Sequence, residues 1–151
     1  DLQLNPQMPH NVSTILYDLS IKHKAFKVGL SLDISDSHLF EDLPNYFGGM
    51  RIQEWEHQFW VNKIDNEFYE LYAAAVDTTF ALVNWENHLV DTNGKDNLFD
   101  NIRIAGNFTA KHLPWYKDFL CQNLLEEELA ILKKHNISST IMSVMSKYQK
   151  L

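Results

Sequence analysis

Residues 26–34 read Phe-Lys-Val-Gly-Leu-Ser-Leu-Asp-Ile, and this stretch carries the clearest structural signal in the chain. Apolar residues alternate with polar or small ones from Phe26 to Ile34. In a β-strand successive side chains point to opposite faces of the sheet, so the alternation predicts a strand with one buried face. We therefore expect a fold built around a sheet that contains these residues.

Short runs of β-branched and aromatic residues extend from about Ile15 to Ile104, separated by clusters of Asp, Asn, Gly and Ser. Residues 68–76 and 79–85 lie on either side of an Asp-Thr-Thr turn and predict a hairpin. Residues 91–97 contain Asn-Gly, which suits positive φ in a tight turn, and residues 102–108 predict another short strand. This spacing favours an antiparallel sandwich over a βαβ fold.

The pattern changes at Pro114. Between residues 117 and 134 leucines recur at three- and four-residue steps, and acidic residues precede basic ones, as the macrodipole of an amphipathic helix favours. A second helical segment is predicted from Ser138 or Ser139. We expect a β-sandwich over residues 1–112 and an amphipathic helical extension over residues 113–151, which packs on the sandwich or extends from it.

The composition indicates one folded, acidic chain. Its 151 residues are 45% hydrophobic and 13% aromatic, which suffices for one sizeable core. The net charge of −7 works against binding to nucleic acid or anionic lipid, since both require clustered Lys and Arg. No apolar run approaches the roughly 18 residues that span a bilayer, so membrane insertion is not expected.

The compartment stays open on sequence grounds. Cys121 is the single cysteine, which excludes an intrachain disulfide and mildly favours the cytoplasm. Three Asn-x-Ser/Thr sequons, at Asn11, Asn107 and Asn136, leave secretion open, because they are glycosylation acceptors in secreted proteins.

Two segments resemble the C-terminal half of a galectin domain. They are residues 80–88, Phe-Ala-Leu-Val-Asn-Trp-Glu-Asn-His, and residues 102–108, Ile-Arg-Ile-Ala-Gly-Asn-Phe. With the strand at residues 26–34, the resemblance covers about residues 8–110. It implies a mostly β fold, an antiparallel galectin-like β-sandwich of the jelly-roll type, followed here by a C-terminal α-helical extension.

The sugar-binding motif of the galectin family is altered in this chain. In the family, a His, an Asn and an Arg alternate along one strand, and a Trp-x-x-Glu-x-Arg motif follows. Trp55 and Gln58 fit the Trp and Glu of the second motif, while Trp60 stands where its Arg is expected. The three positions of the first motif hold Glu41, Leu43 and Asn45. The resemblance therefore implies a changed ligand site on the concave sheet face, with Asn45, Trp55 and Gln58 as candidate ligand-binding residues.

Other candidate sites have ordinary structural explanations. Trp55, Trp60 and Trp85 could form an aromatic platform for a sugar, although Trp60 and Trp85 are expected in the core. Paired carboxylates for glycoside hydrolysis could come from Glu41, Glu54 and Glu56, which we interpret as surface charges. The seven histidines show no metal-ligand spacing, so neither a metal site nor a cofactor is predicted.

The sequence thus predicts a non-enzymatic protein-interaction or assembly module on a galectin-like scaffold. The alternative is a divergent lectin that binds a glycan on the concave sheet face, and a two-carboxylate glycoside hydrolase is a distant third. The expected partner is a protein or a glycan, not nucleic acid. The helical tail is a candidate surface for homo-oligomerisation.

Overall fold

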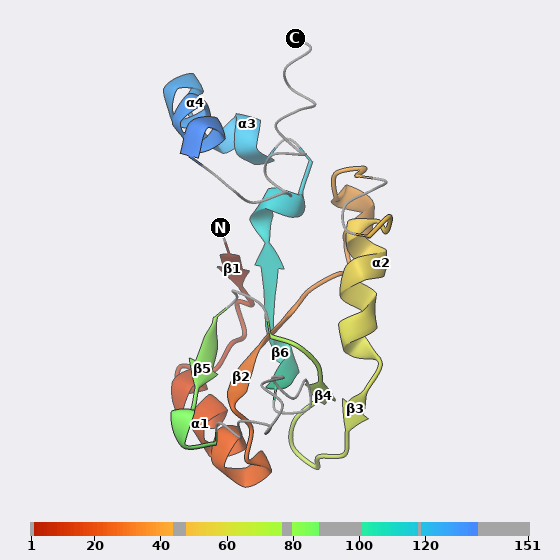
Figure 1. The fold of residues 1–151 in the computed structure, drawn as a ribbon, viewed down its shortest axis with the longest axis vertical. Coiled ribbons are helices and arrows are strands. Elements are labelled where there is room, and N and C mark those ends of the chain that lie inside the picture. Colours follow the sequence, from red (N-terminus) through yellow and green to blue (C-terminus); the bar gives the residue numbers. More distant parts are fainter. Residues whose placement is uncertain (1, 44–47, 77–79, 88–100, 118, 136–151) are drawn as a thin grey trace, which may run out of the picture. The chain divides into compact units, whose positions relative to one another are not determined.

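The fold was obtained as a computed structural model and contains two packing units (Figure 1). We call them the sheet unit, which comprises residues 2–33 and 57–111, and the second unit, which comprises residues 34–56 and those from residue 112 onward. The predicted domain boundary after residue 112 stays a prediction. The structure describes residues 2–43, 48–76, 80–87, 101–117 and 119–135.

The sheet unit is built on one mixed sheet with the strand order β3-β4-β6-β2-β5, and β1 pairs with β6. Its centre is the pair of its two longest strands, β2 and β6, with Leu71 of β4 packed beside them. Strands were predicted at residues 26–34, 68–76, 79–85 and 102–108, and β2, β4 and β5 lie within the first three ranges while β6 spans the fourth. The strands are β1 (Leu2–Leu4), β2 (Lys27–Leu32), β3 (Lys63–Ile64), β4 (Leu71–Ala73), β5 (Ala81–Val83) and β6 (Asn101–His112).

The predicted pairing of these strands is wrong at two points. Strand β4 pairs with β3 and β6, and β5 pairs antiparallel with β2, so residues 68–76 and 79–85 form no hairpin with each other. Strands β2 and β6 run parallel, with Val28 beside Ile102 and Leu30 beside Ile104. Periodicity reports which residues are in strands but not which strands meet, and for this reason the antiparallel expectation fails at the centre. A sandwich of galectin type is not confirmed.

Helix α1 (Val12–His23) lies where strands were predicted to begin. Leu16 and Leu19 are buried against the sheet, and α1 packs on β2 and β5. The helix ends at Lys24, whose left-handed backbone lets its amide donate to the carbonyl of Ile21. The strand prediction from Ile15 is therefore wrong, and the missed signal is the helical spacing of the apolar residues.

Strand β2 is buried on both faces, whereas its alternation predicted one buried face. Val28 and Leu30 are fully buried, and the intervening Gly29 and Ser31 are buried as well. A Cβ on Gly29 would lie 2.4 Å from Cγ1 of Val76, so the absence of a side chain permits this close approach. The small residues of β2 therefore form a second packed face rather than a solvated one.

The second unit contains two segments that run side by side. Phe40 and Tyr116 form an antiparallel bridge, and the amide of Glu41 donates to the carbonyl of Trp115 at 2.7 Å. The rings of Phe40, Trp115 and Tyr116 pack together, with centroids 5.1 to 5.6 Å from that of Phe40. The hydroxyl of Tyr116 donates to Oδ1 of Asp36, which ties the two segments at a further point.

The helices of the second unit are α2 (Ile52–His57), whose last residue belongs to the sheet unit, α3 (Phe119–Asn123) and α4 (Glu126–His135). The predicted C-terminal helicity is confirmed, but two helices replace one. The amide of Leu125 donates to Oε2 of Glu128, which starts α4 as a new helix. The turn predicted at residues 91–97 and the helix predicted from Ser138 lie outside the described residues.

Candidate functional site

Two of the three predicted ligand-binding residues, Trp55 and Gln58, do not lie on a sheet face. Trp55 is half-buried on α2, and Gln58 is exposed at the start of the short 3-10 helix Gln58–Trp60. Asn45 lies outside the described residues. Helix α2 forms because Oε2 of Glu54 accepts the amide of Arg51 at 2.8 Å, half of a capping box. The predicted sheet-face placement is therefore wrong for Trp55 and Gln58, and ligand binding by the three residues stays a prediction.

The candidate carboxylates were interpreted as surface charges, but two of the three are buried. Glu41 and Glu56 are buried, with exposed fractions of 8% and 2%, whereas Glu54 is exposed. Buried carboxylates require polar contacts, and neither Glu41 nor Glu56 is without an interaction partner. The interpretation as surface charges is therefore wrong for these two residues.

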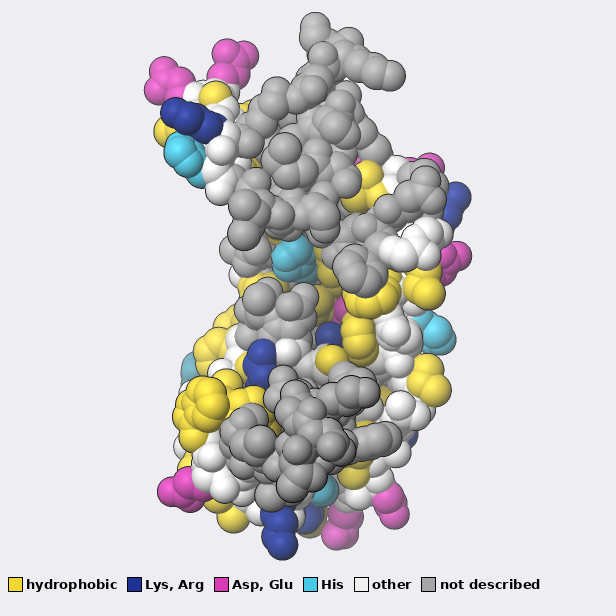
Figure 2. Space-filling view, viewed as in Figure 1, with side chains coloured by type: hydrophobic (Ala, Val, Ile, Leu, Met, Phe, Trp, Pro, Cys, Tyr) yellow, Lys and Arg dark blue, Asp and Glu magenta, His cyan; other side chains and the backbone are white. Residues whose placement is uncertain are grey.

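Apolar side chains gather on one face of the sheet unit, around α1 and β5. Tyr17 and Ile21 of α1, Val83 of β5 and Trp85 after β5 are between 41% and 72% exposed. Figure 2 shows hydrophobic side chains where α1 and β5 lie in Figure 1. We call these four residues the α1–β5 surface. Trp85 is the most exposed of the four, at 72%, so the prediction that it belongs to the core is wrong.

Buried hydrogen bonds fix the backbone on either side of Trp85. The side-chain amide of Asn84 donates to Oγ of Ser20 at 3.1 Å, and the backbone amide of Asn84 donates to the carbonyl of Phe26 at 2.7 Å. The side-chain amide of Asn87 donates to the carbonyl of Ser20 at 2.9 Å. The ring of Phe26 meets that of Trp85 edge to face at 5.2 Å. Trp85 is therefore exposed on a rigid support.

A shallow pocket of about 190 Å³ lies beside Trp85. Two aromatic rings, from Tyr17 and Trp85, stand next to the polar side chains of Asn84 and Glu86. Such a lining suits one apolar side chain of a partner or one face of a sugar ring. The pocket is lined by Tyr17, Leu82, Val83, Asn84, Trp85 and Glu86.

Strand β5 is the outer strand on this side of the sheet, within the part of the chain that the structure describes. The amide of Leu30 donates to the carbonyl of Phe80, and the amide of Asn84 donates to that of Phe26. Backbone groups alternate in direction along an antiparallel strand, so the amides and carbonyls of Ala81 and Val83 point away from β2. The apolar surface therefore borders a row of outward hydrogen-bonding groups that pair with no other described strand.

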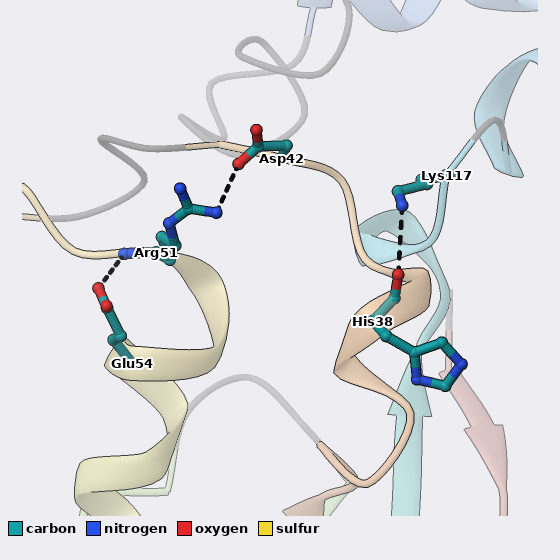
Figure 3. A network of polar contacts seen from close by, with 5 residues as sticks. All are labelled: His38, Asp42, Arg51, Glu54 and Lys117. Atoms are coloured by element: carbon teal, nitrogen blue, oxygen red, sulfur yellow. Dashed lines mark hydrogen bonds and ion pairs between the residues drawn. The ribbon is translucent and has the colours of Figure 1, made fainter.

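The second unit has a polar pocket of about 430 Å³ between the segment that follows β2 and the first turn of α2. Figure 3 shows Arg51 turned toward Asp42, with 2.9 Å between Nη1 and Oδ1, and the ammonium of Lys117 above the carbonyl of His38 at 3.2 Å. Both partners of the Arg51–Asp42 pair are largely exposed, so the pair contributes little to stability. The network closes one side of the pocket with charges of both signs.

Two titratable groups of the sheet unit have shifted pKa values. Burial, the hydrogen bond to Oε1 of Glu70 at 2.5 Å and the charge of Glu70 raise the pKa of Tyr72 to about 12. Burial and the charge of Lys22 lower the pKa of His23. Neither residue lines the two pockets described above. The described residues include no group of three or more His, Cys, Asp or Glu that could hold a metal ion.

The described helices are all too short or too polar to cross a membrane. Comparison of the chain with protein-family models, with curated proteins and with solved structures found no match. The surfaces are therefore interpreted from their geometry and chemistry.

Proposed function

We propose that this chain is a non-enzymatic protein-interaction module whose partner docks on the α1–β5 surface. The observation that carries the proposal is Trp85, a large aromatic side chain that is 72% exposed on a rigid support. Residues that dominate protein interfaces are enriched in Trp and Tyr, and this surface presents both.

The energetics favour covering this surface. Burial of apolar area contributes about 25 cal/mol per Å², so covering the exposed part of one Trp side chain yields about 2–4 kcal/mol before the costs of association. The buried hydrogen bonds of Asn84 hold Trp85 before any partner arrives. A support that is already ordered reduces the entropy lost on binding.

The open edge of β5 adds a second means of recognition. The outward amides and carbonyls of Ala81 and Val83 can pair with an extended segment of a partner chain. Main-chain hydrogen bonds then contribute affinity, and the pocket beside Trp85 selects a side chain. These two features together favour a protein partner over a small molecule.

Substitution of Trp85→Ala tests the proposal. Removing a central interface Trp typically costs at least about 2 kcal/mol, which is about 30-fold in affinity. Quantitative affinity capture should therefore recover partners with the wild-type chain that are lost with Trp85→Ala. The matched control is Phe68→Ala, because Phe68 is 75% exposed in the connection between β3 and β4. Equal recovery by all three proteins, each folded by circular dichroism, would overturn the proposal.

A glycan is the second candidate ligand of this chain. The specific observation in its favour is that two aromatic rings and the polar groups of Asn84 and Glu86 line one shallow pocket. A glycan array decides between the ligands: binding lost in Trp85→Ala places a sugar on the α1–β5 surface. Binding lost in Trp55→Ala instead supports the site predicted from Asn45, Trp55 and Gln58. The galectin relationship stays a prediction from the resemblance over about residues 8–110, and the proposed function does not depend on it.

A further inference from the structure

We infer that the pocket beside Trp85 takes a positively charged side chain, an arginine or lysine of the partner protein. The inference rests on the proposed function, because it uses the α1–β5 surface. It adds the chemical class of the group that this surface selects, which is the side chain of a basic segment.

The described lining of this pocket combines two aromatic rings with one charged side chain, a carboxylate. The rings are those of Tyr17 and Trp85, which are 51% and 72% exposed, and the carboxylate is that of the exposed Glu86. The face of an aromatic ring is the negative part of its quadrupole and attracts cations. Lys22 and Lys24, at the end of α1, lie outside the described lining. The rings and the carboxylate therefore both favour a positive charge.

The turn that carries Trp85 and Glu86 is held in place by Asn84. Oδ1 of Asn84 accepts the backbone amide of Glu86 at 3.1 Å, and the backbone carbonyl of Asn84 accepts the amide of Asn87 at 3.1 Å. The side-chain nitrogen of Asn84 donates to Oγ of Ser20. Both ends of this side-chain amide are thus engaged within the chain, and Glu86 supplies the charge that a ligand meets.

A cation fits this lining better than the other side-chain classes of a partner. An apolar side chain would pack on the rings but would cover the carboxylate of Glu86 without pairing it, which costs free energy. An acidic side chain would be repelled by that carboxylate and by the ring faces. Arginine stacks its planar guanidinium on an aromatic ring and donates N–H groups to a carboxylate, so one side chain satisfies both parts. The net charge of −7 also favours the approach of a basic segment.

The test is an NMR titration of the intact chain with two five-residue peptides that have blocked ends. One is Gly-Ser-Arg-Ser-Gly, and the other has citrulline in place of arginine, which keeps nearly the same shape and removes the charge. The observed signal is the indole N–H of Trp85, identified by its loss in Trp85→Ala. We expect a saturable shift with the arginine peptide and a dissociation constant about tenfold lower than that of the citrulline peptide.

Glu86→Gln tests the carboxylate at nearly constant volume. This variant should weaken binding of the arginine peptide about threefold to fivefold and leave the citrulline peptide almost unaffected. The matched control is Glu67→Gln, which removes an exposed carboxylate in the connection between β3 and β4. It changes the net charge by the same amount, so an unchanged dissociation constant in this variant assigns the effect to the pocket.

Three outcomes overturn the inference. One is an unchanged Trp85 signal in the presence of the arginine peptide, and another is equal binding of the two peptides. The third is equal weakening by Glu86→Gln and Glu67→Gln, which would attribute the effect to net charge. None of them removes the proposed function, because protein capture that depends on Trp85 would then indicate a partner that inserts a different group. Capture that does not depend on Trp85 removes the proposed function instead, whatever the peptides show.

Discussion

The two edge strands of the sheet, β3 and β5, differ in charge, although both are short. Strand β3 carries the exposed Lys63, whose ammonium lies 3.9 Å from Oε1 of Glu70. Strand β5 consists of Ala81, Leu82 and Val83, with no charge on the strand. A charged side chain on an edge strand disfavours pairing with another chain. The difference teaches that, within the part of the chain that the structure describes, a charge protects the β3 edge and none protects the β5 edge; we call these the protected side and the open side.

The side-chain contacts next to the two edge strands also differ. On the protected side the buried Arg103 of β6 reaches across to the carbonyl of Ala75 and lies over the ring of Phe59. On the open side Gly29 packs closely against β5, and the side-chain amides of Asn84 and Asn87 donate to Ser20 of α1. A long side chain of the central strand β6 thus supports the protected side, and close packing together with short side-chain amides supports the open side.

The largest effect is expected for Arg103→Met, which tests the protected side. The guanidinium lies 4.1 Å from the centre of the Phe59 ring, and Nε donates to the carbonyl of Ala75 at 2.7 Å. Methionine retains apolar volume but leaves that carbonyl without its donor, so the free energy of unfolding should fall by about 2–4 kcal/mol. Urea unfolding followed by circular dichroism measures this free energy of unfolding.

Arg103→Lys is the matched control, because it keeps the charge and loses the planar donor group. We expect it to recover only part of the lost stability. A loss below about 1 kcal/mol for Arg103→Met would show that the protected side does not depend on this residue.

The next effect is expected for Gly29→Ala, which tests the open side. Its new Cβ would meet Cγ1 of Val76 at 2.4 Å and Cβ of Ala81 at 2.9 Å, so β5 or residue 76 must shift. Overpacking of this kind costs about 1–3 kcal/mol, and the shifted edge should also weaken binding of a partner at β5. Urea unfolding measures the first effect, and quantitative affinity capture measures the second.

The combination Gly29→Ala with Val76→Ala sharpens the same test. Val76→Ala removes the closest clashing atom, so the double variant should be more stable than the sum of the two single effects implies. Additive losses would contradict the assignment of the clash to Val76 and leave Ala81 as its source.

The sequence allowed the strands to be predicted but not the partners of each strand. The alternation at residues 26–34 is a local signal, and β2 was found there. Its partner β6 lies more than 70 residues away and runs parallel, and no local pattern carries that information. Helix α1 was missed because Ile15 and its neighbours were interpreted as a strand, although Leu16 and Leu19 are spaced as on a helix.

The candidate site was less predictable than the strands, for a physical reason. The exposure of Trp85 depends on the direction in which the chain leaves β5, which is set by hydrogen bonds from Asn84 and Asn87 to Ser20 on α1. Ser20 lies 64 residues from Asn84 and 67 from Asn87, so no local sequence spacing indicates these hydrogen bonds. Trp55 was placed on a sheet face because it matches the Trp of the second galectin motif, whereas Glu54, three residues after Arg51, was the available signal for a helix start.

The smallest effect is expected at His23, in the last turn of α1, which packs on β2 and β5. Burial and the charge of Lys22 lower the pKa of this histidine in the folded chain below its ordinary value of 6.5. The unfolded chain therefore binds a proton first as the pH falls, so stability is fully present above that value and decreases below it. His23→Gln should make the unfolding midpoint less dependent on pH between about 7.5 and 5. Lys22→Gln should retain most of the dependence, because burial is the larger cause, whereas an identical dependence in the wild-type chain and His23→Gln would contradict the assignment.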